Sequence, residues 1–308
     1  MCKSRVVAGE VRYGDKVQTH YLSTEDQRQG FALLCQAQPC SDLVIQTDEI
    51  VGMENLRPRL TPCRVVEMTR KSSDIMVLRL RLPMNENVVF FSGQHLSFVL
   101  QDGARREYSI ANACGPAGMT VIELHIRRYP GGLFTDRLFT EISVGALMQI
   151  ELPLGTFFLR TDETNPIVLM ATGTGFAPIK GMVEQAVATG VIADREIVLY
   201  WGGRHREDLY MSELADTWAR EFPRFRFVPI LSRPGPEWTG RTGYVQQNVL
   251  SDYTDLSKYD VYACGSPAMV EDARTSLASL GAAAPARFYG DEFLTSADKS
   301  ERDDRVQQ

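Results

Sequence analysis

The sequence predicts a multidomain protein in which a small antiparallel β-barrel precedes an α/β domain built on a parallel sheet. The chain has 308 residues, about twice the ~150 residues of a typical single domain. Its middle third contains short segments in which hydrophobic residues alternate, as they do in strands with one buried face. Its last part contains continuous apolar runs separated by helical stretches, the pattern of a parallel sheet with crossover helices.

The barrel is expected between residues 63 and 162. Gly, Pro and Asp separate four segments that alternate toward one hydrophobic face, namely residues 75–82, 96–100, 121–126 and 147–154. A β-sandwich would show the same pattern. Ahead of these segments, Pro58 and Pro62 stand close together among arginines, which predicts an extended linker over residues 51–62.

The α/β domain is expected between residues 163 and 294. Its predicted strands are residues 167–171, 197–201, 225–231 and 261–263, and its predicted helices are residues 178–189 and 209–222. The polar segment 295–308 is expected to be a frayed tail.

Composition excludes several classes of protein. Lys and Arg number 33 against 39 Asp and Glu, so the net charge of −6 does not favour a nucleic-acid binder. No apolar run approaches the ~18 residues of a membrane span, and the N-terminus lacks the apolar core of a signal peptide. Six cysteines are too few for a disulfide scaffold, which predicts a reducing, cytoplasmic environment. The four histidines lack metal-site spacing, which disfavours zinc chemistry.

A glycine-rich turn follows the first apolar strand of the α/β domain. Gly173 and Gly175 come directly after this strand, and Pro178 falls in the first turn of the next helix, where a missing N–H costs nothing. Such a turn lets backbone N–H groups and the helix dipole attract a phosphate. A tight strand–helix turn without a ligand has the same sequence. The turn is not a Gly-x-Gly-x-x-Gly fingerprint, and no acidic residue closes the second strand at residues 201–204.

Two further elements lie in the barrel region. Arg106 and Tyr108 share one face of a strand, where a guanidinium suits a pyrophosphate and a phenol ring suits stacking on a planar heterocycle. An ordinary amphipathic strand would look the same. The Pro-Gly-Gly turn at residues 130–132 presents N–H groups to a phosphate in one interpretation and is a plain hairpin turn in the other.

The order and spacing of these elements resemble the ferredoxin–NADP reductase superfamily, in which a flavin-binding barrel precedes a nicotinamide-binding domain. The flavin motif Arg-x-Tyr-Ser-x-x-Asn is matched by Arg106, Tyr108, Ser109 and Asn112. A second flavin element is matched by His125, Ile126, Arg127, Gly131, Gly132 and Thr135. The nicotinamide motif is matched by residues 173–178, and the late Cys-Gly-x-Pro-x-Met motif by residues 264–269.

The resemblance implies a role for the matched residues. Arg106 would bind the FAD pyrophosphate, Tyr108 would stack on the flavin ring, and Ser109 would hydrogen-bond near its reactive nitrogen. Gly132 and Thr135 would bind phosphate oxygens. Cys264 would lie beside the nicotinamide carbon that gives up hydride, although a buried thiol at a strand end has the same sequence. The nicotinamide cofactor would contact the largest set, Gly173, Thr174, Gly175, Pro178, Gly202, Arg204, Cys264, Gly265 and Pro267.

The same resemblance implies a closing strand near the C-terminus that brings an aromatic side chain toward the flavin. Phe288 is the candidate, with Tyr289 and Phe293 as alternatives. The choice of nicotinamide depends on residues 201–210: Arg204 and Arg206 would suit NADPH, whereas Asp208-Leu209-Tyr210 is similar to the NADH-using branch. We expect NADH.

The first fifty residues resemble the later part of a plant-type [2Fe–2S] ferredoxin domain, a partial β-grasp. Cys2 would correspond to the third cluster ligand and Cys35 to the fourth, whereas Cys40 falls beyond the pattern. Two ligands are too few for a cluster. Either the ferredoxin domain is truncated here, which we favour, or the chain has lost its cluster.

The resemblance therefore implies an NADH-dependent reductase. Electrons would pass from NADH to FAD, on to a [2Fe–2S] cluster if the full ferredoxin domain exists, and then to a partner enzyme. Residues 155–160, 175–180 and 200–204 are most similar to the CDP-6-deoxy-3,4-glucoseen reductases, whose partner is a dehydratase. The reductase of a phenol- or ring-hydroxylating oxygenase is the alternative. A non-catalytic, redox-sensing nucleotide-binding module is an alternative of another class.

Overall fold

The computed structural model describes residues 3–13, 22, 24–34, 36–46, 53, 56–129, 131–161 and 163–293. These residues belong to two compact units, which meet in sequence between residues 55 and 56. We describe each unit by itself.

The first unit is a small β structure. An antiparallel three-stranded sheet has the order β3 (Phe31–Leu33), β1 (Lys3–Ala8) and β5 (Val44–Gln46). A second pair joins β2 (Val11–Tyr13) to β4 (Ala37–Pro39), and α1 spans Thr24–Arg28. Cys2 and Cys35 lie outside the described residues, so the ferredoxin-like interpretation of this segment stays a prediction.

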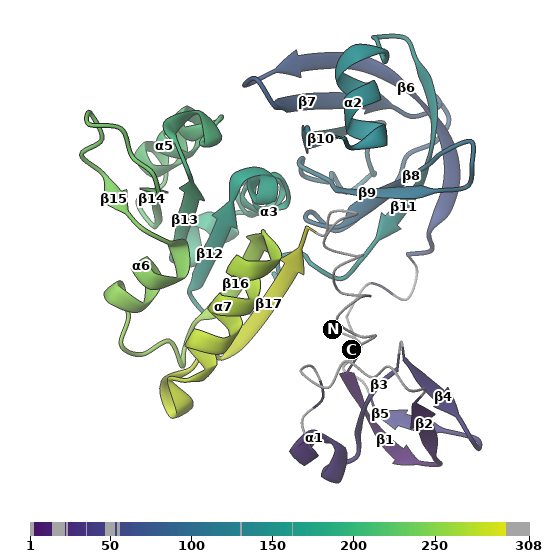
Figure 1. Cartoon of the computed structure of the whole chain (residues 1–308), viewed down its shortest axis with the longest axis vertical. Helices are drawn as coiled ribbons and strands as arrows, with labels where there is room; N and C mark the ends of the chain where they lie inside the picture. The colour runs from purple at the N-terminus through teal and green to yellow at the C-terminus, as the bar shows by residue number, and fades with distance from the viewer. Residues whose placement is uncertain are drawn as a thin grey trace. The chain divides into compact units, whose positions relative to one another are not determined.

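The second unit begins with the predicted antiparallel barrel, which is confirmed (Figure 1). Its strand order is β10-β7-β6-β11-β8-β9, and a bridge between Ile110 and Leu124 brings the end of β9 back to β10. Strands β6 and β9 alternate between more and less exposed side chains, as the sequence pattern predicts, whereas β7, β8 and β10 are buried at most positions. Their bounds are β6 Arg59–Arg70, β7 Ile75–Arg81, β8 His95–Val99, β9 Arg105–Ser109, β10 Val121–Arg127 and β11 Leu147–Leu154, with helix α2 at Leu133–Thr140.

One expectation for this region is wrong. The predicted linker over residues 51–62 ends too late, because β6 begins at Arg59 and includes Pro62. Pro62 pairs with Gln149 of β11, whereas the pairing of β6 with β7 begins only at Arg64. At Pro62 the strand therefore has a partner on one side, so a residue without an N–H is tolerated.

The predicted parallel sheet is also confirmed, with the strand order β15-β14-β13-β12-β16-β17. Its strands are β12 Ile167–Thr172, β13 Ile197–Gly203, β14 Phe225–Leu231, β15 Arg241–Thr242, β16 Asp260–Gly265 and β17 Arg287–Glu292. The α-helices are α3 Phe176–Ala188, α4 Val191–Asp194, α5 Ser212–Glu221, α6 Val245–Asp252 and α7 Pro267–Ala278. Short 3-10 turns are η2 Gly173–Gly175, η3 Arg206–Asp208 and η4 Gly281–Ala283.

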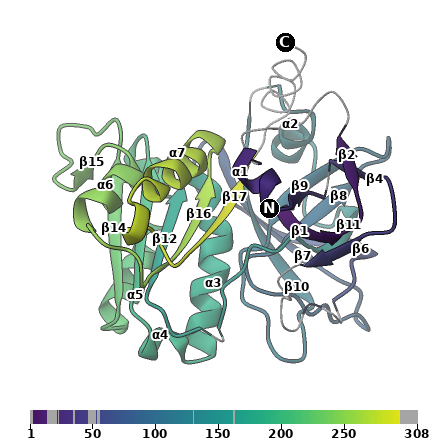
Figure 2. The same cartoon turned by 90° about the horizontal axis from the view of Figure 1, so that it is seen from below.

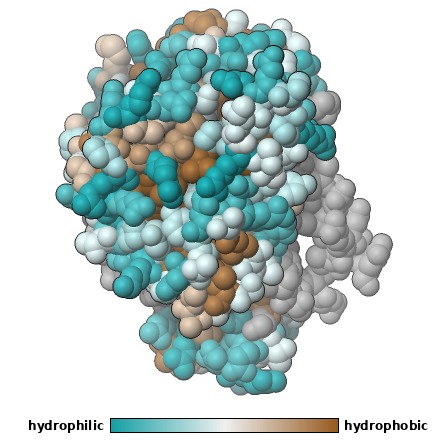
Figure 3. All heavy atoms as spheres, turned by 90° about the vertical axis from the view of Figure 1, so that its left-hand side faces the viewer, coloured by the Kyte–Doolittle hydropathy of each residue, from teal (hydrophilic) through white to brown (hydrophobic). Residues whose placement is uncertain are grey.

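Helices cover both faces of this sheet (Figures 1 and 2). Ile167, Leu169 and Ala171 of β12 pack with α3 and α5 on one face. Val168 and Met170 pack with α6 and α7 on the other. This explains the continuous apolar runs in the sequence, because every position of a central strand is buried. Viewed from the side on which α5 and β15 lie in Figure 1, the surface mixes hydrophilic residues with smaller hydrophobic patches (Figure 3).

Candidate functional site

The carboxyl ends of β12, β13 and β16 bring the predicted nicotinamide motifs together. Gly173 follows β12 with φ +52°, a left-handed conformation that favours glycine. The turn η2 leads directly into α3, so the first N–H groups of a long helical segment face this edge without intrahelical acceptors. Thr174 is buried, and Pro178 lies in the first turn of α3, as predicted. The arrangement suits an anionic ligand.

The end of β16 packs tightly against this turn. A Cβ atom on Gly175 would overlap the carbonyl oxygen of Cys264, and one on Gly265 would overlap the Thr172 hydroxyl. Ser266 caps α7 by accepting a hydrogen bond from the Met269 N–H at 3.3 Å, and Pro267 occupies the first helical position. Two helix N-termini therefore meet at adjacent strand ends.

The loop after β13 folds around a buried carboxylate. Oδ2 of Asp208 accepts hydrogen bonds from the N–H groups of Arg204 (2.8 Å) and His205 (3.1 Å). Burial would raise the pKa of Asp208, but these bonds and the charge of Arg127 hold it below its usual value. Gly202 stands against Val245 with no room for a Cβ atom.

The flavin motif lies on β9 and the residues after it. The Tyr108 ring packs edge-on to Phe98 (5.8 Å between centroids) and at a tilt to Phe134 (5.6 Å), and burial raises its pKa. Arg106 makes no ion pair among the described residues and donates only to the adjacent carbonyl of Arg105 (2.8 Å). Asn112 holds β9 to β10, because its Oδ1 accepts the Glu123 N–H at 2.8 Å.

The glycine pair after β10 forms a helix start. Gly131 has φ +78°, and Gly132 is the residue before α2. Thr135 is buried and donates to the Gly132 carbonyl at 3.2 Å. The alternative of a plain hairpin turn is wrong, because a helix rather than a strand follows.

Ser109 and Cys264 come together through a residue that the sequence motifs did not include. Asp291 of β17 pairs in register with Cys264, and the Cys264 thiol lies 3.9 Å from its Oδ2. Ser109 of the barrel lies near enough to Asp291 to lower the pKa of its carboxyl. Burial, reinforced by the negative charges of Glu107 and Glu292, raises the pKa of Asp291 to about 7. Burial likewise raises the pKa of Cys264, so its thiol stays protonated. This group can hold a proton at the junction of barrel and parallel sheet near neutral pH.

Two predicted flavin residues of β10 have side chains that contact the α/β domain. The Arg127 guanidinium donates to Asp74 at 2.8 Å and forms an ion pair with Asp208. His125 is fully buried, with Nδ1 2.7 Å from the Tyr210 hydroxyl and Nε2 3.1 Å from Glu123. Between them, Ile126 is a core residue of the barrel.

Of the three aromatic candidates on the closing strand, Phe293 is nearest the strand ends. Its N–H donates to the carbonyl of Gly265 at 2.9 Å. Phe288 pairs with Val261, three positions before Cys264, and packs beneath Arg274. Tyr289 stacks on Tyr262 with 4.7 Å between ring centroids.

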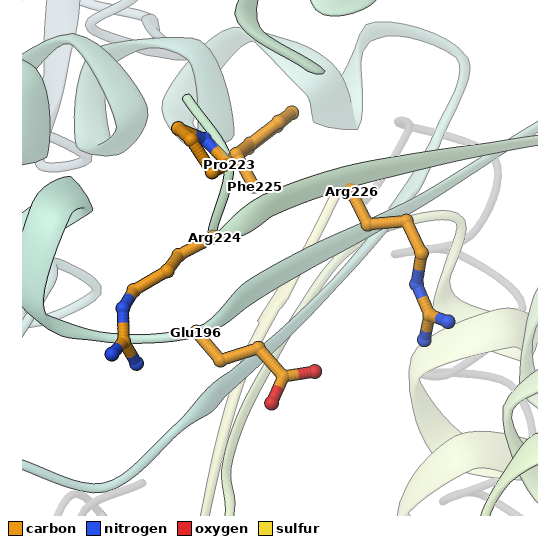
Figure 4. Close-up of a pocket in the computed structure, with 5 residues that line it drawn as sticks. All are labelled: Glu196, Pro223, Arg224, Phe225 and Arg226. Atoms are coloured by element: carbon orange, nitrogen blue, oxygen red, sulfur yellow. The ribbon is translucent and has the colours of Figure 1, made fainter. Parts of the chain in front are cut away.

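A surface pocket of about 300 Å³ lies at the other edge of the parallel sheet (Figure 4). It is lined by Glu196, Pro223, Arg224, Phe225 and Arg226, which stand at the amino ends of β13 and β14. Ligands of open α/β sheets bind at the carboxyl ends of the strands. The pocket therefore does not mark the nucleotide site.

Asp291, Asp208, Tyr210 and Trp201 are the functional candidates that motif reasoning missed as ligands or positioning residues. Their importance arises from contacts between distant segments, such as the register of β17 on β16. The sequence did hold a signal for Asp208 and Tyr210, because both belong to the segment 208–210 that is similar to the NADH-using branch of the family. No group of three or more His, Cys, Asp or Glu side chains suited to a metal ion occurs in the part of the chain that the structure describes.

Comparison with known families agrees with this division of the second unit. An oxidoreductase FAD-binding domain family matches residues 62–159, and an oxidoreductase NAD-binding domain family matches residues 169–275. Barrel and parallel-sheet domain thus define the class of FAD- and NAD-binding oxidoreductases.

Individual relatives narrow the class. A CDP-6-deoxy-L-threo-D-glycero-4-hexulose-3-dehydrase reductase of Yersinia pseudotuberculosis is 38% identical over 295 residues, 96% of this chain and 86% of that protein. Reductase component 1 of terephthalate 1,2-dioxygenase from Comamonas is 33% identical over 298 residues, with 96% and 85% covered. The crystal structure of an Amycolatopsis cytochrome P450 reductase superposes with a TM-score of 0.76 at 34% identity, covering 96% of this chain and 87% of that one.

The chain belongs to the ferredoxin reductase family of FAD- and NAD-binding oxidoreductases. It is an NAD(P)H-dependent flavoprotein reductase that transfers electrons, which confirms the enzyme interpretation over a non-catalytic module. None of the helices in the described part of the chain is both long and apolar enough for a membrane span.

Proposed function

We propose that the protein takes an electron pair from NADH into FAD at the junction of Ser109, Asp291 and Cys264 and delivers electrons to a partner enzyme. The observation that carries this proposal is that junction: a barrel hydroxyl, a carboxyl with a pKa near neutrality and a strand-end thiol meet where two helix N-termini converge. Bound FAD would accept the hydride of NADH and can release electrons singly.

The barrel residues fit a flavin dinucleotide. Arg106 is free of carboxylate partners among the described residues, so its guanidinium can bind a pyrophosphate. Tyr108 is half-buried and offers a ring for stacking. Gly131 has open space around it, and Gly132 with Thr135 starts α2, which places N–H groups for phosphate oxygens. Ser109 would hydrogen-bond the flavin beside Asp291.

The α/β domain fits a nicotinamide dinucleotide. Gly173, Thr174 and Gly175 would hold its pyrophosphate, and Gly265 with Pro267 would bind at the start of α7. Cys264 would pack against the nicotinamide ring as a neutral thiol. We favour NADH over NADPH because of the loop after β13, which would lie beside the adenosine ribose. In this loop the Asp208 carboxylate accepts a hydrogen bond from the Arg204 N–H, and a negative charge there disfavours a 2′-phosphate.

Asp291 would control the proton at this site. With a pKa of about 7, its carboxyl changes charge near neutral pH, and Ser109 and the Cys264 thiol both influence that pKa. Hydride transfer and the later release of electrons require a proton to be held and given up. Asp291 lies against Cys264, and Ser109 helps to set its pKa.

For the partner, we favour a dehydratase that acts on a nucleotide-linked deoxyhexulose, because a dehydrase reductase of that type is 38% identical over 96% of the chain. An oxygenase component is the second candidate, supported by the terephthalate dioxygenase reductase at 33% identity. A [2Fe–2S] cluster would involve Cys2 and Cys35, which lie outside the described residues. Cys40 is exposed.

The deciding experiment is reconstitution. Purified protein is loaded with FAD, reduced with NADH or NADPH, and offered ferricyanide, a sugar-nucleotide dehydratase or an oxygenase component. The proposal expects NADH-dependent ferricyanide reduction and faster turnover with the dehydratase. Electron transfer to the oxygenase component but not to the dehydratase would identify the oxygenase as the partner class. Absence of NADH oxidation would overturn the proposed reductase function. Iron and sulfide analysis of the same sample tests for a cluster.

A further inference from the structure

A chain of contacts runs from the barrel to the glycine turn at the nucleotide site. It begins at the buried His125 on β10, continues through Tyr210 and Trp201, and ends at Gly173. No cofactor motif includes Tyr210 or Trp201 as a contact residue. In this series of contacts, Trp201 and Tyr210 each have a separate structural role.

Trp201 holds the turn directly. It is completely buried near the end of β13, and its ring stacks on Phe176 with 3.9 Å between centroids and an 8° tilt. Its indole N–H donates to the carbonyl oxygen of Gly173 at 3.0 Å. Gly173 is in a left-handed conformation, and its carbonyl oxygen accepts both this bond and one from the Phe176 N–H, so the indole adds a second, long-range partner to the peptide. The same peptide begins the segment whose N–H groups face the strand ends.

Tyr210 fixes Trp201 and joins it to the barrel. The two rings meet edge to face, 5.3 Å apart at 90°. The Tyr210 hydroxyl lies 2.7 Å from His125 Nδ1. Glu123 is held ionised by His125 and by Lys180, which lies 3.0 Å away, so His125 Nε2 must donate to it. In the neutral imidazole Nδ1 is then the acceptor, and Tyr210 donates.

We propose that His125, Tyr210 and Trp201 are positioning residues that hold the Gly173–Gly175 turn in the conformation that receives the pyrophosphate of the nicotinamide cofactor. This assigns His125 to the nucleotide turn rather than to direct contact with the flavin. The inference rests on the proposed function, since it deepens the role of the same site. It makes affinity for the nucleotide depend on a barrel residue.

The test measures binding of ADP-ribose, which carries the pyrophosphate without the nicotinamide, by calorimetry on the FAD-loaded full chain. Tyr210→Phe removes only the hydroxyl that reaches His125, and Trp201→Phe removes the N–H that reaches Gly173. Each is expected to weaken binding about three- to tenfold, the effect of losing one buried hydrogen bond. The double variant is expected to lose less ADP-ribose affinity than the product of the two single-variant losses, because both changes act on the same series of contacts.

Tyr200→Phe is the matched control. Tyr200 is the preceding residue of β13, is equally buried and donates its hydroxyl to Asp252 at 2.6 Å on the opposite face of the sheet. It should leave ADP-ribose affinity unchanged. At saturating NADH, the rate of flavin reduction should stay within about twofold for all variants, whereas the Michaelis constant should rise only in Tyr210→Phe, Trp201→Phe and their double variant.

Unchanged affinity in both Tyr210→Phe and Trp201→Phe would overturn the inference while leaving the reductase function intact. An equal loss in Tyr200→Phe, or a fully multiplicative double variant, would also overturn it, because the effect would then be general destabilisation or two independent contacts. If the unaltered protein bound neither ADP-ribose nor NADH, the proposed function would fail and the inference with it.

Discussion

Asp291→Asn is expected to remove a pH dependence of stability that the partly buried Asp291 carboxyl confers. Asp291 has a pKa of about 7 in the folded chain, against 3.8 for an ordinary Asp. Because the folded-state value is the higher one, the stabilisation of the protonated carboxyl is present below about pH 4 and is lost as the pH rises through 7. A shift of roughly three pKa units corresponds to at most ~4 kcal/mol of unfolding free energy.

The assay compares thermal unfolding midpoints of wild type and Asp291→Asn at pH 5 and pH 8. At pH 5 the folded wild-type carboxyl is protonated but the unfolded one is ionised, so the variant should exceed the wild-type midpoint by less than half of its excess at pH 8. At pH 8 the wild type carries a partly buried charge, and the variant should unfold on the order of 5–10 °C higher, at ~2–4 °C per kcal/mol. Taking the difference between the two proteins cancels the other titrating groups.

Glu107→Gln provides a second variant in the same assay. The charge of Glu107 helps to raise the pKa of Asp291, so its removal should move the midpoint of the stability change to lower pH. If the difference between wild type and Asp291→Asn were the same at pH 5 and pH 8, the carboxyl would not titrate near neutrality. The proton-holding role assigned to it would then be wrong.

Three other changes test separate parts of the site. Gly175→Ala should lower NADH affinity at least tenfold, because its methyl group would overlap the Cys264 carbonyl oxygen; wild-type affinity would contradict the packing of β16 on the turn. Arg106→Ala should weaken FAD binding about ten- to hundredfold in a fluorescence titration, the loss of a charged hydrogen bond, with little change in the thermal midpoint of the FAD-free protein; unaltered FAD affinity would remove Arg106 from the flavin site. A double-mutant cycle of Arg127→Gln and Asp208→Asn should give a coupling energy of ~1–3 kcal/mol in thermal unfolding, because the ion pair is largely buried, and additive effects would speak against the contact.

The pattern of hydrophobic residues predicted much of the second unit correctly. Residues 147–154 and 225–231 coincide with β11 and β14. The helix expected at residues 209–222 begins only at Ser212, because Asp208 closes the preceding residues into the turn η3. The local sequence pattern cannot predict this late start of the helix. The side chain of Asp208, which forms the turn before the helix, is held by Arg127 from the barrel, a residue distant in sequence.

The parts of the site that short motifs define through backbone conformation could be predicted from the sequence. Gly173 and Gly265 both have the positive φ that their motifs require. Asp291 escaped prediction because its role depends on the register of β17 against β16, which spacing along the chain does not encode. The choice among Phe288, Tyr289 and Phe293 likewise depends on register, which places Phe293 beside Gly265 and Phe288 opposite Val261.

The most direct test of the central claim is anaerobic titration of the FAD-loaded full chain with NADH, followed by absorption spectroscopy. The account predicts a tightly bound yellow flavin that bleaches on addition of NADH and recovers its colour when ferricyanide is added. A protein that binds no FAD, or whose bound flavin keeps its colour in excess NADH and NADPH, would contradict it.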